Sequence, residues 1–395
     1  MRKAVLCGLL ALIVGLGFSG PAFAEEGITD TEILLGSHQD FSGPIAMWGI
    51  QQKMGAELRI KEVNDAGGIH GRKIRAIFED NGYDPKKAIM ATNKLISRDK
   101  VFMFFQNQGS VCAAATKPII SAKKIPQFFP SAANRVLYDP YDRYCMMGWT
   151  PYQDETRAST EYFITKKKYT KFGSLYQDDE MGVSMHNGVV DQLAVHNMKP
   201  VAVENYKRGA TDFSTQVARL KKADVEIIML GTIVRETVNI MKEVRKLGWK
   251  VDLCGPKTAA TQAIIDLSLA SGFSPEGYYA SAQSEIPYPD TTDEVVKAYI
   301  KRFKDLHGVY PDASSYGGYE AIDYFAKVAE KVGKDLTREK WIDAAHAYGW
   351  YHFPMGGVPV MFTSTDHQGS YDAILTQVRN GRYVKIADIS YRNKK

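Results

Sequence analysis

The sequence predicts an α/β protein built from two doubly wound lobes, each a parallel sheet covered by helices. Three observations predict this class. Extended apolar runs alternate repeatedly with runs of helical period along the chain. This alternation restarts after Pro151. Without its first 24 residues, the chain of 395 still has 371, which exceeds the size at which a single hydrophobic core keeps growing.

The first 24 residues have the pattern of a secretory signal peptide. Two basic residues precede an apolar run over residues 4–18, and residues 22–24, Ala-Phe-Ala, offer a small-residue cleavage site. The apolar run is shorter than the roughly 20 residues that span a bilayer, and no later stretch is longer. We therefore expect export and cleavage before Glu25.

In the first series, each extended run is followed by a run of helical period. Gly67-Gly68 is typical of the end of a helix, and Asp84 is placed to cap a helix with Pro85 in its first turn. The expected strands cover residues 33–36, 73–79, 101–105, 127–129 and 144–147. The expected helices cover residues 49–66, a segment starting at Pro85, and 110–122.

The second series begins after residues 149–151, Trp-Thr-Pro, which we interpret as a hinge. Val234, Val238 and Met241 share one face of a helix. The expected strands cover residues 172–176, 201–205, 226–230 and 251–254. The expected helices cover residues 154–168, 181–196, 211–223, 233–247, 261–270, 292–307, 314–332 and 338–347.

The chain ends in a predicted hairpin, residues 371–378 and 383–389, that turns at Asn380-Gly381. In doubly wound sheets the ligand binds beyond the carboxyl ends of the strands. With two such lobes, the predicted ligand site is the cleft between them.

Composition and motifs exclude several function classes. The net charge of +5 falls to +3 without Arg2 and Lys3, and the charges are scattered, so we expect no nucleic-acid surface. The chain lacks HExxH, CxxC and close clusters of histidine and carboxylate, so we expect neither a metal site nor a cofactor. It also lacks a Gly-x-Ser-x-Gly elbow, a P-loop and, after residue 24, a dinucleotide fingerprint. An enzyme is therefore not expected.

Three cysteines remain after the predicted cleavage, Cys112, Cys145 and Cys254. Because an exported protein folds in an oxidising compartment, one pair can form a disulfide. Cys112 with Cys145 is the preferred pair. The odd count leaves at least one thiol free.

A series of short motifs runs in one order along nearly the whole chain after residue 24. The longest covers residues 64–74, Asn-Asp-Ala-Gly-Gly-Ile-His-Gly-Arg-Lys-Ile. The others are Ser42-Gly43-Pro44, Trp48-Gly49, Asp80, Asp84-Pro85, Gly109-Ser110, Pro130-Ser131-Ala132, Asp212-Phe213-Ser214, Ala218-Arg219-Leu220-Lys221 and Gly255-Pro256. Together they resemble the leucine/isoleucine/valine-binding proteins of bacterial ABC importers.

The resemblance implies a type I periplasmic binding protein fold. Two α/β lobes joined by a three-strand hinge would close over a small solute and deliver it to the ABC permease. The protein would be a periplasmic monomer. The three crossings would lie near residues 148–152, 281–285 and 356–360. Lobe one would comprise residues 25–148 and 285–356, and lobe two residues 149–284 and 357–395.

The resemblance also assigns residues to the ligand carboxylate. The family holds it with a serine after the third strand and with backbone groups of the loop after the fourth, here Ser110 and Ser131-Ala132-Ala133. Ser110 opens a helix whose unpaired N–H groups and dipole favour an anion, although it can serve as an N-cap as well. Ser131 could equally be a solvated loop serine. Trp48 matches an aromatic wall of the family pocket, the alternative being a core tryptophan under the loop.

Other positions depart from the family pattern. Members that bind α-amino acids present an acidic residue just after Gly-Pro to meet the ligand ammonium, and here that position is Lys257. A cation there favours an anionic or polar acceptor instead, unless the side chain points to solvent. A family tyrosine aligns with Met181 and its counterpart with Thr232 or Ile233, so the pocket loses hydroxyls and gains apolar, deformable surface.

We therefore predict a binding protein for a carboxylate without an α-amino group, with an aromatic or branched aliphatic body. Gln108 and Gln177 are further candidates for polar contacts at the cleft rim. Two alternatives remain open. One is a binding protein for branched-chain or other amino acids, and the other is a soluble co-receptor that passes ligand state to a membrane receptor.

Overall fold

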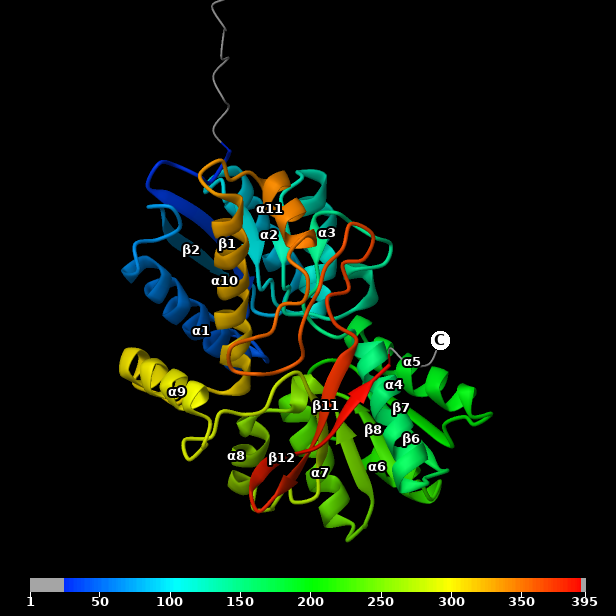
Figure 1. The fold of residues 1–395 in the computed structure, drawn as a ribbon. Coiled ribbons are helices and arrows are strands. Elements are labelled where there is room, and N and C mark those ends of the chain that lie inside the picture. The colour runs from blue at the N-terminus through cyan, green and yellow to red at the C-terminus, as the bar shows by residue number, and fades with distance from the viewer. Residues whose placement is uncertain (1–24, 392–395) are drawn as a thin grey trace, which may run out of the picture.

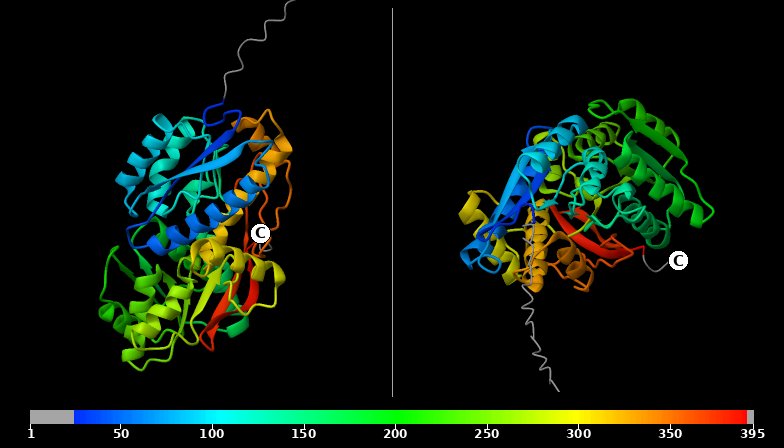
Figure 2. Two further views of the ribbon diagram at one scale, coloured as in Figure 1. Left: turned by 90° about the vertical axis from the view of Figure 1, so that its left-hand side faces the viewer. Right: turned by 90° about the horizontal axis from the view of Figure 1, so that it is seen from above.

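The computed structural model describes residues 25–391 of the chain. The predicted signal peptide and its cleavage site therefore lie outside the described residues. Two sheets organise the described part, and each forms the centre of one lobe. The two lobes lie one above the other in Figure 1 and are seen from two further sides in Figure 2. The predicted α/β fold with two parallel-sheet lobes is confirmed.

The sheet of the first lobe has five parallel strands in the order β2-β1-β3-β4-β5. These strands are β1 (Glu32–Gln39), β2 (Lys73–Asp80), β3 (Met103–Phe105), β4 (Gln127–Phe128) and β5 (Cys145–Met146). Its helices are α1 (Ala46–Asp65), α2 (Pro85–Ser97), α3 (Ser110–Ala122), a 3-10 turn at Arg135–Leu137, α9 (Glu294–His307), α10 (Ala313–Val332) and α11 (Arg338–His346).

Helices cover both faces of this sheet. Because neighbouring residues of a strand point to opposite faces, Leu34 and Phe104 pack with residues of α2 and α3. Leu35 belongs instead to a cluster that includes residues of α10 and α11. The lobe is therefore doubly wound, as the alternating pattern predicts.

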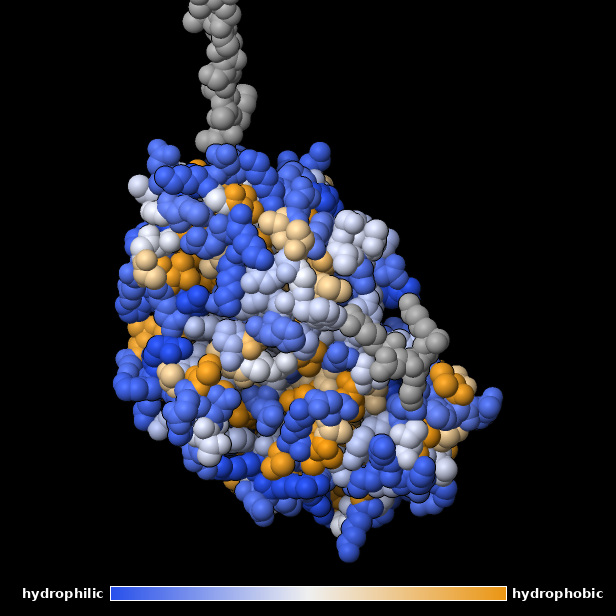
Figure 3. Space-filling view, viewed as in Figure 1, coloured by the Kyte–Doolittle hydropathy of each residue, from blue (hydrophilic) through white to orange (hydrophobic). Residues whose placement is uncertain are grey.

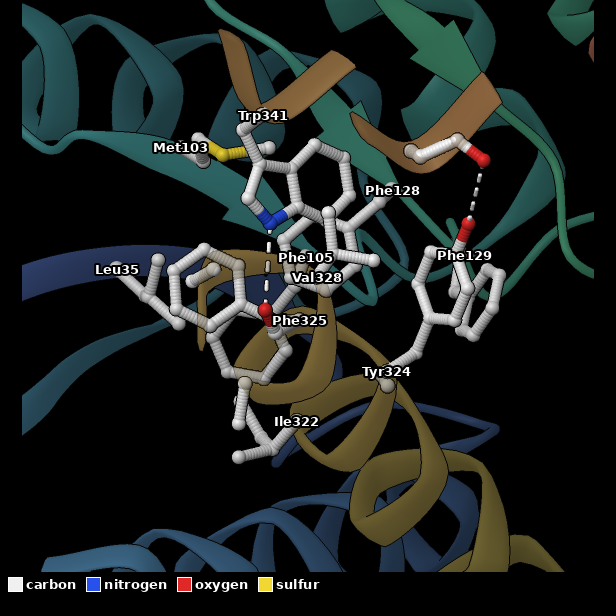
Figure 4. Packing of buried hydrophobic residues seen from close by; sticks show 14 of the residues in the cluster. Leu35, Met103, Phe105, Phe128, Phe129, Ile322, Tyr324, Phe325, Val328 and Trp341 are labelled. Carbon is white, nitrogen blue, oxygen red and sulfur yellow. Dashed lines mark hydrogen bonds between the residues drawn. The ribbon is translucent and has the colours of Figure 1, made fainter. Parts of the chain in front are cut away.

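An aromatic cluster holds α10 and α11 on the first sheet (Figure 4). The Phe128 ring stacks on Phe325 of α10 with centroids 5.6 Å apart, and its centroid lies 5.3 Å from that of Trp341 on α11. The Trp341 indole N–H donates to the backbone carbonyl of Phe325 at 3.2 Å. Buried aromatic pairs of this kind stabilise a core beyond the area they bury. The C-terminal part of the chain thus returns to the lobe that the N-terminal part builds.

The sheet of the second lobe has seven strands in the order β12-β11-β10-β9-β8-β6-β7. Its elements are β6 (Phe172–Gln177), β7 (Ala202–Tyr206), β8 (Ile227–Gly231), β9 (Asp252–Gly255), β10 (Tyr279–Ala282), β11 (Asp372–Arg379) and β12 (Arg382–Ser390). Its helices are α4 (Tyr152–Tyr162), α5 (Glu180–Val195), α6 (Ser214–Lys222), α7 (Val234–Lys246), a 3-10 turn at Lys257–Ala259, and α8 (Gln262–Ala270). Strands β6 to β10 are parallel, whereas β11 is antiparallel to both β10 and β12.

Two elements of the second lobe differ from the sequence predictions. The helix expected over residues 154–168 ends its α-helical part at Tyr162 and continues as a π-helical turn, Phe163–Lys167. Strand β10 has no predicted counterpart. Its sequence, Tyr-Ala-Ser-Ala, lacks a run of β-branched residues, and pairing with β9 and β11 on either side defines it instead.

The crossings between the lobes meet at Gln283. The Thr150 N–H donates to the Gln283 side-chain oxygen at 3.4 Å, and the Val358 N–H donates to the Gln283 carbonyl at 3.0 Å. After Val358 the chain does not enter the second lobe, because Phe362 packs in the core cluster of the first and the Gly369 N–H donates to the Met147 carbonyl at 2.8 Å. We therefore place the third crossing near residues 370–372 rather than at the predicted 356–360.

The predicted disulfide between Cys112 and Cys145 is wrong. Both residues, and Cys254, are buried free thiols. Cys112 packs beside Tyr83 and Ala88, whereas Cys145 belongs to a separate apolar cluster. Burial raises the pKa of the Cys112 and Cys145 thiols to about 12, so each behaves as a small apolar side chain.

Residues 25–391 contain neither a helix that could span a membrane nor a cluster of metal-binding side chains. Within residues 25–391, no helix combines the length and apolar content that a bilayer crossing requires. No group of three or more His, Cys, Asp or Glu side chains in the same range is arranged to hold a metal ion. The face drawn in Figure 3 is mainly hydrophilic, with hydrophobic residues interspersed over both lobes.

Candidate ligand-binding site

A cavity lies between the two lobes. It is bounded by the segments that follow strands of both sheets, including the start of α3 and the starts of α5 and α7. This is the place where doubly wound sheets bind ligands. The lining residues are Ile45, Trp48, Tyr83, Gln108, Gly109, Ser110, Ser131, Ala132, Trp149, Tyr152, Met181, Ile233, Lys257 and Thr258.

Eight of the eleven residues expected from the sequence line this cavity. They are Trp48, Gln108, Ser110, Ser131, Ala132, Met181, Ile233 and Lys257. The other three lie behind the wall. The Ala133 carbonyl accepts a hydrogen bond from the Tyr152 N–H at 2.9 Å, the buried Gln177 amide donates to Asp179, and the Thr232 hydroxyl bonds to Thr237 at 2.6 Å.

Six lining residues were not expected from the sequence: Ile45, Tyr83, Gly109, Trp149, Tyr152 and Thr258. Two signals could have found some of them. Trp149 and Tyr152 flank the proline of the predicted hinge, so a hinge at the mouth of a cleft places both rings beside the ligand. Tyr83 follows the carboxyl end of β2, where doubly wound sheets bring residues to the cleft.

One end of the cavity presents hydrogen-bond donors. Helix α3 begins there, and its N-cap is Gly109 without a side-chain cap, so Ser110 is the first helical residue rather than the cap. The Ser131 hydroxyl accepts a hydrogen bond from the Gln52 amide at 2.7 Å, which leaves its own proton available to donate. Unpaired N–H groups of a helix start add donors and a favourable dipole. This end of the cavity suits an anion.

Gly109 is required by its conformation and by its neighbour. Its φ is 92°, a value that L-residues with a side chain rarely adopt. A Cβ atom at this position would lie 2.7 Å from Cδ2 of Tyr83. The glycine therefore allows the start of α3 and the Tyr83 ring to approach each other at the cavity wall.

Two indole N–H groups add further donors. The Nε1 atoms of Trp48 and Trp149 are buried, and neither has a hydrogen-bond partner among the described residues. An indole can donate but cannot accept, and a buried unpaired donor is costly. Acceptor atoms on a bound molecule would satisfy these groups.

Lys257 is buried, so it does not point to solvent. Its Nζ lies 3.2 Å from Oε2 of Glu155, and the ammonium also donates to the Thr150 carbonyl. The Lys257 backbone N–H donates to Oε1 of the same carboxylate at 2.8 Å. Burial lowers the pKa of Lys257, while the charge of Glu155 opposes that shift. The positive charge of Lys257 is therefore already paired with a buried carboxylate.

Contacts join the lobes across the cleft. The Arg208 guanidinium of the second lobe donates to the Tyr83 carbonyl of the first at 3.2 Å and lies 5.3 Å from the centroid of the Tyr83 ring. On another side, the Gln262 N–H donates to Oδ2 of Asp312 at 3.2 Å. The structure thus shows the lobes in direct contact around the cavity.

Comparisons with known proteins agree with this architecture. The family model described as "Periplasmic binding protein" matches residues 32–382. The Leu/Ile/Val-binding protein of Escherichia coli K12 is 27% identical over 311 residues, which cover 78% of this chain and 80% of the relative.

Two solved structures are also similar in fold. A fatty acid ABC transporter substrate-binding protein from Thermomonospora curvata has a TM-score of 0.81 and 23% identity, covering 93% of this chain and 95% of that chain. A solute-binding protein of an ABC transporter from R. palustris, in complex with benzoate, has a TM-score of 0.78 and 19% identity, covering 90% and 96%. The chain therefore belongs to the periplasmic binding protein family, as a member similar to the Leu/Ile/Val-binding proteins with their type I fold.

Proposed function

We propose that the protein is the extracytoplasmic solute-binding component of an ABC importer and captures a small carboxylate in the cavity between its lobes. The ligand has an aromatic or branched aliphatic body and lacks an α-amino group. One observation carries the proposal. The residues that line the cavity combine donors at one end with aromatic and apolar walls, and they include no aspartate or glutamate.

The donor end suits the carboxylate. The start of α3 and the hydroxyls of Ser110 and Ser131 face the same cavity. A carboxylate that accepts several charge-assisted hydrogen bonds is held more strongly than a neutral acceptor. Backbone N–H groups at a helix start provide such bonds without a compensating cation.

The walls suit an apolar body. Trp48, Tyr83, Trp149, Met181 and Ile233 surround the rest of the cavity. Aromatic faces and a polarisable methionine accept a flat ring or a branched chain equally well. We therefore propose only that the ligand body is aromatic or branched aliphatic.

An α-ammonium group finds no carboxylate among the residues that line this cavity. Burying an ammonium without an anionic acceptor is expensive. Glu155, the buried carboxylate behind the wall, is already paired with Lys257. The names of the curated relatives support the alternative, a branched-chain amino acid ligand. Among the solved neighbours, two are named for a fatty acid and for benzoate, which lack an amino group, whereas others are named for leucine or isoleucine.

Capture needs no chemistry. A solute that touches both lobes binds the closed form better than the open form and so shifts the population towards closure. Delivery to a permease follows when the partner favours the open form. We propose that the protein acts as a monomer in this cycle, with the permease subunits of an ABC importer as its partner.

A binding panel tests the proposal. Calorimetry and thermal shift on the mature protein would compare benzoate, phenylpyruvate and 4-methyl-2-oxopentanoate with L-leucine, L-valine and L-phenylalanine. We expect binding of at least one acid without an amino group at about micromolar Kd, about 8 kcal/mol, and no binding of the amino acids. Stabilisation by leucine or valine, without any by the other acids, would contradict the proposed ligand class.

A further inference from the structure

A buried ion pair lies directly behind the wall of the cavity. The side chains of Lys257 and Glu155 are 7% and 1% exposed, and their charged atoms lie 3.2 Å apart. Lys257 is one of the residues that line the cavity, whereas Glu155 is not. The lysine side chain therefore separates the ligand space from a buried carboxylate.

The ammonium of Lys257 lies among aromatic rings. Its Nζ is 5.1 Å from the centroid of the Tyr152 ring and 5.7 Å from that of Trp149. Both rings line the cavity. A carboxylate, a backbone carbonyl and two ring faces form a set that binds organic ammonium groups. Here the ammonium group of Lys257 itself occupies this set of acceptors.

The carboxylate is held in place independently of the lysine side chain. Glu155 lies in the first turn of α4. Its Oε1 accepts from the backbone N–H of Lys257 at 2.8 Å and also from the Ser281 hydroxyl. Because neither bond uses the lysine ammonium, removal of that ammonium leaves the carboxylate oriented.

We infer that Lys257 is a specificity-determining residue that occupies an ammonium-binding site with its own side chain and so excludes α-amino acids and other primary amines. The inference rests on the proposed function, because it takes the cavity as the ligand site. An incoming ammonium would meet a site already filled by a cation and would stay unpaired in a buried place. Without the lysine side chain, Glu155 and the two rings would accept it.

Calorimetry on three variants tests this. We expect Lys257→Ala to bind L-phenylalanine, L-leucine or n-propylammonium at least about tenfold more tightly than the wild type, a change of about 1.4 kcal/mol. Lys257→Met is the matched control, because it fills the same space without a charge and should gain nothing. The double variant Lys257→Ala with Glu155→Gln should lose the gain, since its acceptor is neutral.

A stability measurement covers the case in which the single variant folds poorly. Lys257→Ala leaves Glu155 buried without its partner, so its Tm should fall, and n-propylammonium should raise that Tm towards the wild-type value. Folding of Lys257→Ala only in the presence of n-propylammonium would support the inference equally. The double variant should show no such response, because it has no buried charge to neutralise.

The outcomes separate this inference from the proposed function. No gain of amine binding and no thermal response in Lys257→Ala would overturn it, and so would an equal gain in the double variant. The wild-type panel decides the proposed function by itself. If the wild type binds carboxylates while Lys257→Ala shows no binding of amines, the specificity role of Lys257 is rejected and the proposed function stands.

Discussion

The Ser110 hydroxyl lies 3.4 Å from the Tyr152 hydroxyl, to which it can donate. Ser110 begins α3 of the first lobe, and Tyr152 begins α4, just after the chain has crossed to the second. The donor-rich end of the cavity is therefore in contact with a crossing between the lobes. A ligand carboxylate that accepts a hydrogen bond from Ser110 would therefore compete with the contact between Ser110 and Tyr152 at this crossing.

Replacing Ser110 with alanine should weaken binding of a carboxylate ligand. A hydrogen bond to a charged group contributes about 1.5–3 kcal/mol, so the affinity should fall about 10- to 100-fold. Calorimetry with the acid that binds best to the wild type measures the change. Ser97→Ala, at an exposed serine on α2, is the control and should leave Kd unchanged. An unchanged Kd in Ser110→Ala would remove this serine from the site.

Two replacements of Trp48 should separate the contribution of its aromatic face to binding from that of its indole N–H group. Trp48→Ala removes a large aromatic face and should cost about 2 kcal/mol of binding free energy, about 30-fold in Kd. Trp48→Phe retains a ring and loses only the unpaired indole N–H, so its loss should be smaller. If both variants bind as tightly as the wild type, Trp48 is a structural residue rather than a wall of the site.

Replacing Arg208 should loosen the closed form. Its guanidinium contacts the Tyr83 carbonyl and ring across the cleft, and an exposed cation–π contact is worth about 0.5–1 kcal/mol. Arg208→Ala should therefore weaken ligand binding about two- to fivefold, mainly through faster dissociation in stopped-flow measurements. Arg219→Ala breaks an ion pair with Glu204 within the second lobe and should not change the dissociation rate. Equal dissociation rates in the two variants would contradict a role of the Arg208–Tyr83 contact in holding the lobes together.

The Asp312 carboxyl should give a measurable pH dependence of stability. Burial raises its pKa to about 6, and the nearby Asp266 charge acts in the same direction. Since the folded state then binds its proton more tightly than the unfolded state, the contribution of Asp312 to the free energy of unfolding falls as pH rises from about 4 to about 6 and is constant above.

The variant Asp312→Asn isolates this contribution. As the pH rises from 4 to 6.5, the Tm of Asp312→Asn should increase relative to the Tm of the wild type. Differential scanning calorimetry at four or five pH values would measure it. A difference that stays constant over this range would show that the carboxyl titrates normally.

All three thiols of the mature protein should be free and inaccessible. Cys112, Cys145 and Cys254 are buried, so iodoacetamide should label them slowly in the native protein. In guanidinium without a reductant, mass spectrometry should find three labels on each chain. Two missing labels that reappear after reduction would demonstrate a disulfide and contradict the structure.

Features with local signals were predictable from the sequence. Asp84 accepts hydrogen bonds from the N–H groups of Lys86 and Lys87 at 2.7 and 3.2 Å, as an N-cap before a proline should. The start of α3 at Ser110 was likewise set by its neighbours along the chain. Such elements depend on a few consecutive residues, which the sequence displays directly.

Features that depend on distant residues were not predictable. Glu155 and Lys257 are 102 positions apart, and nothing in either segment indicates their pairing. Strand β10 exists because β9 and β11 lie beside it. The third crossing is late because Phe362 packs into the core of the first lobe. Each case is decided by tertiary packing rather than by propensity.

The most direct test of the proposed function is to identify the molecule that the protein carries. The mature protein would be purified without exposure to denaturant, unfolded in acid, and its released small molecules analysed by mass spectrometry against a matched sample of Ser110→Ala. We predict a carboxylate without an α-amino group, aromatic or branched aliphatic, that is enriched in the wild type. Leucine, isoleucine or valine released in its place would contradict the account.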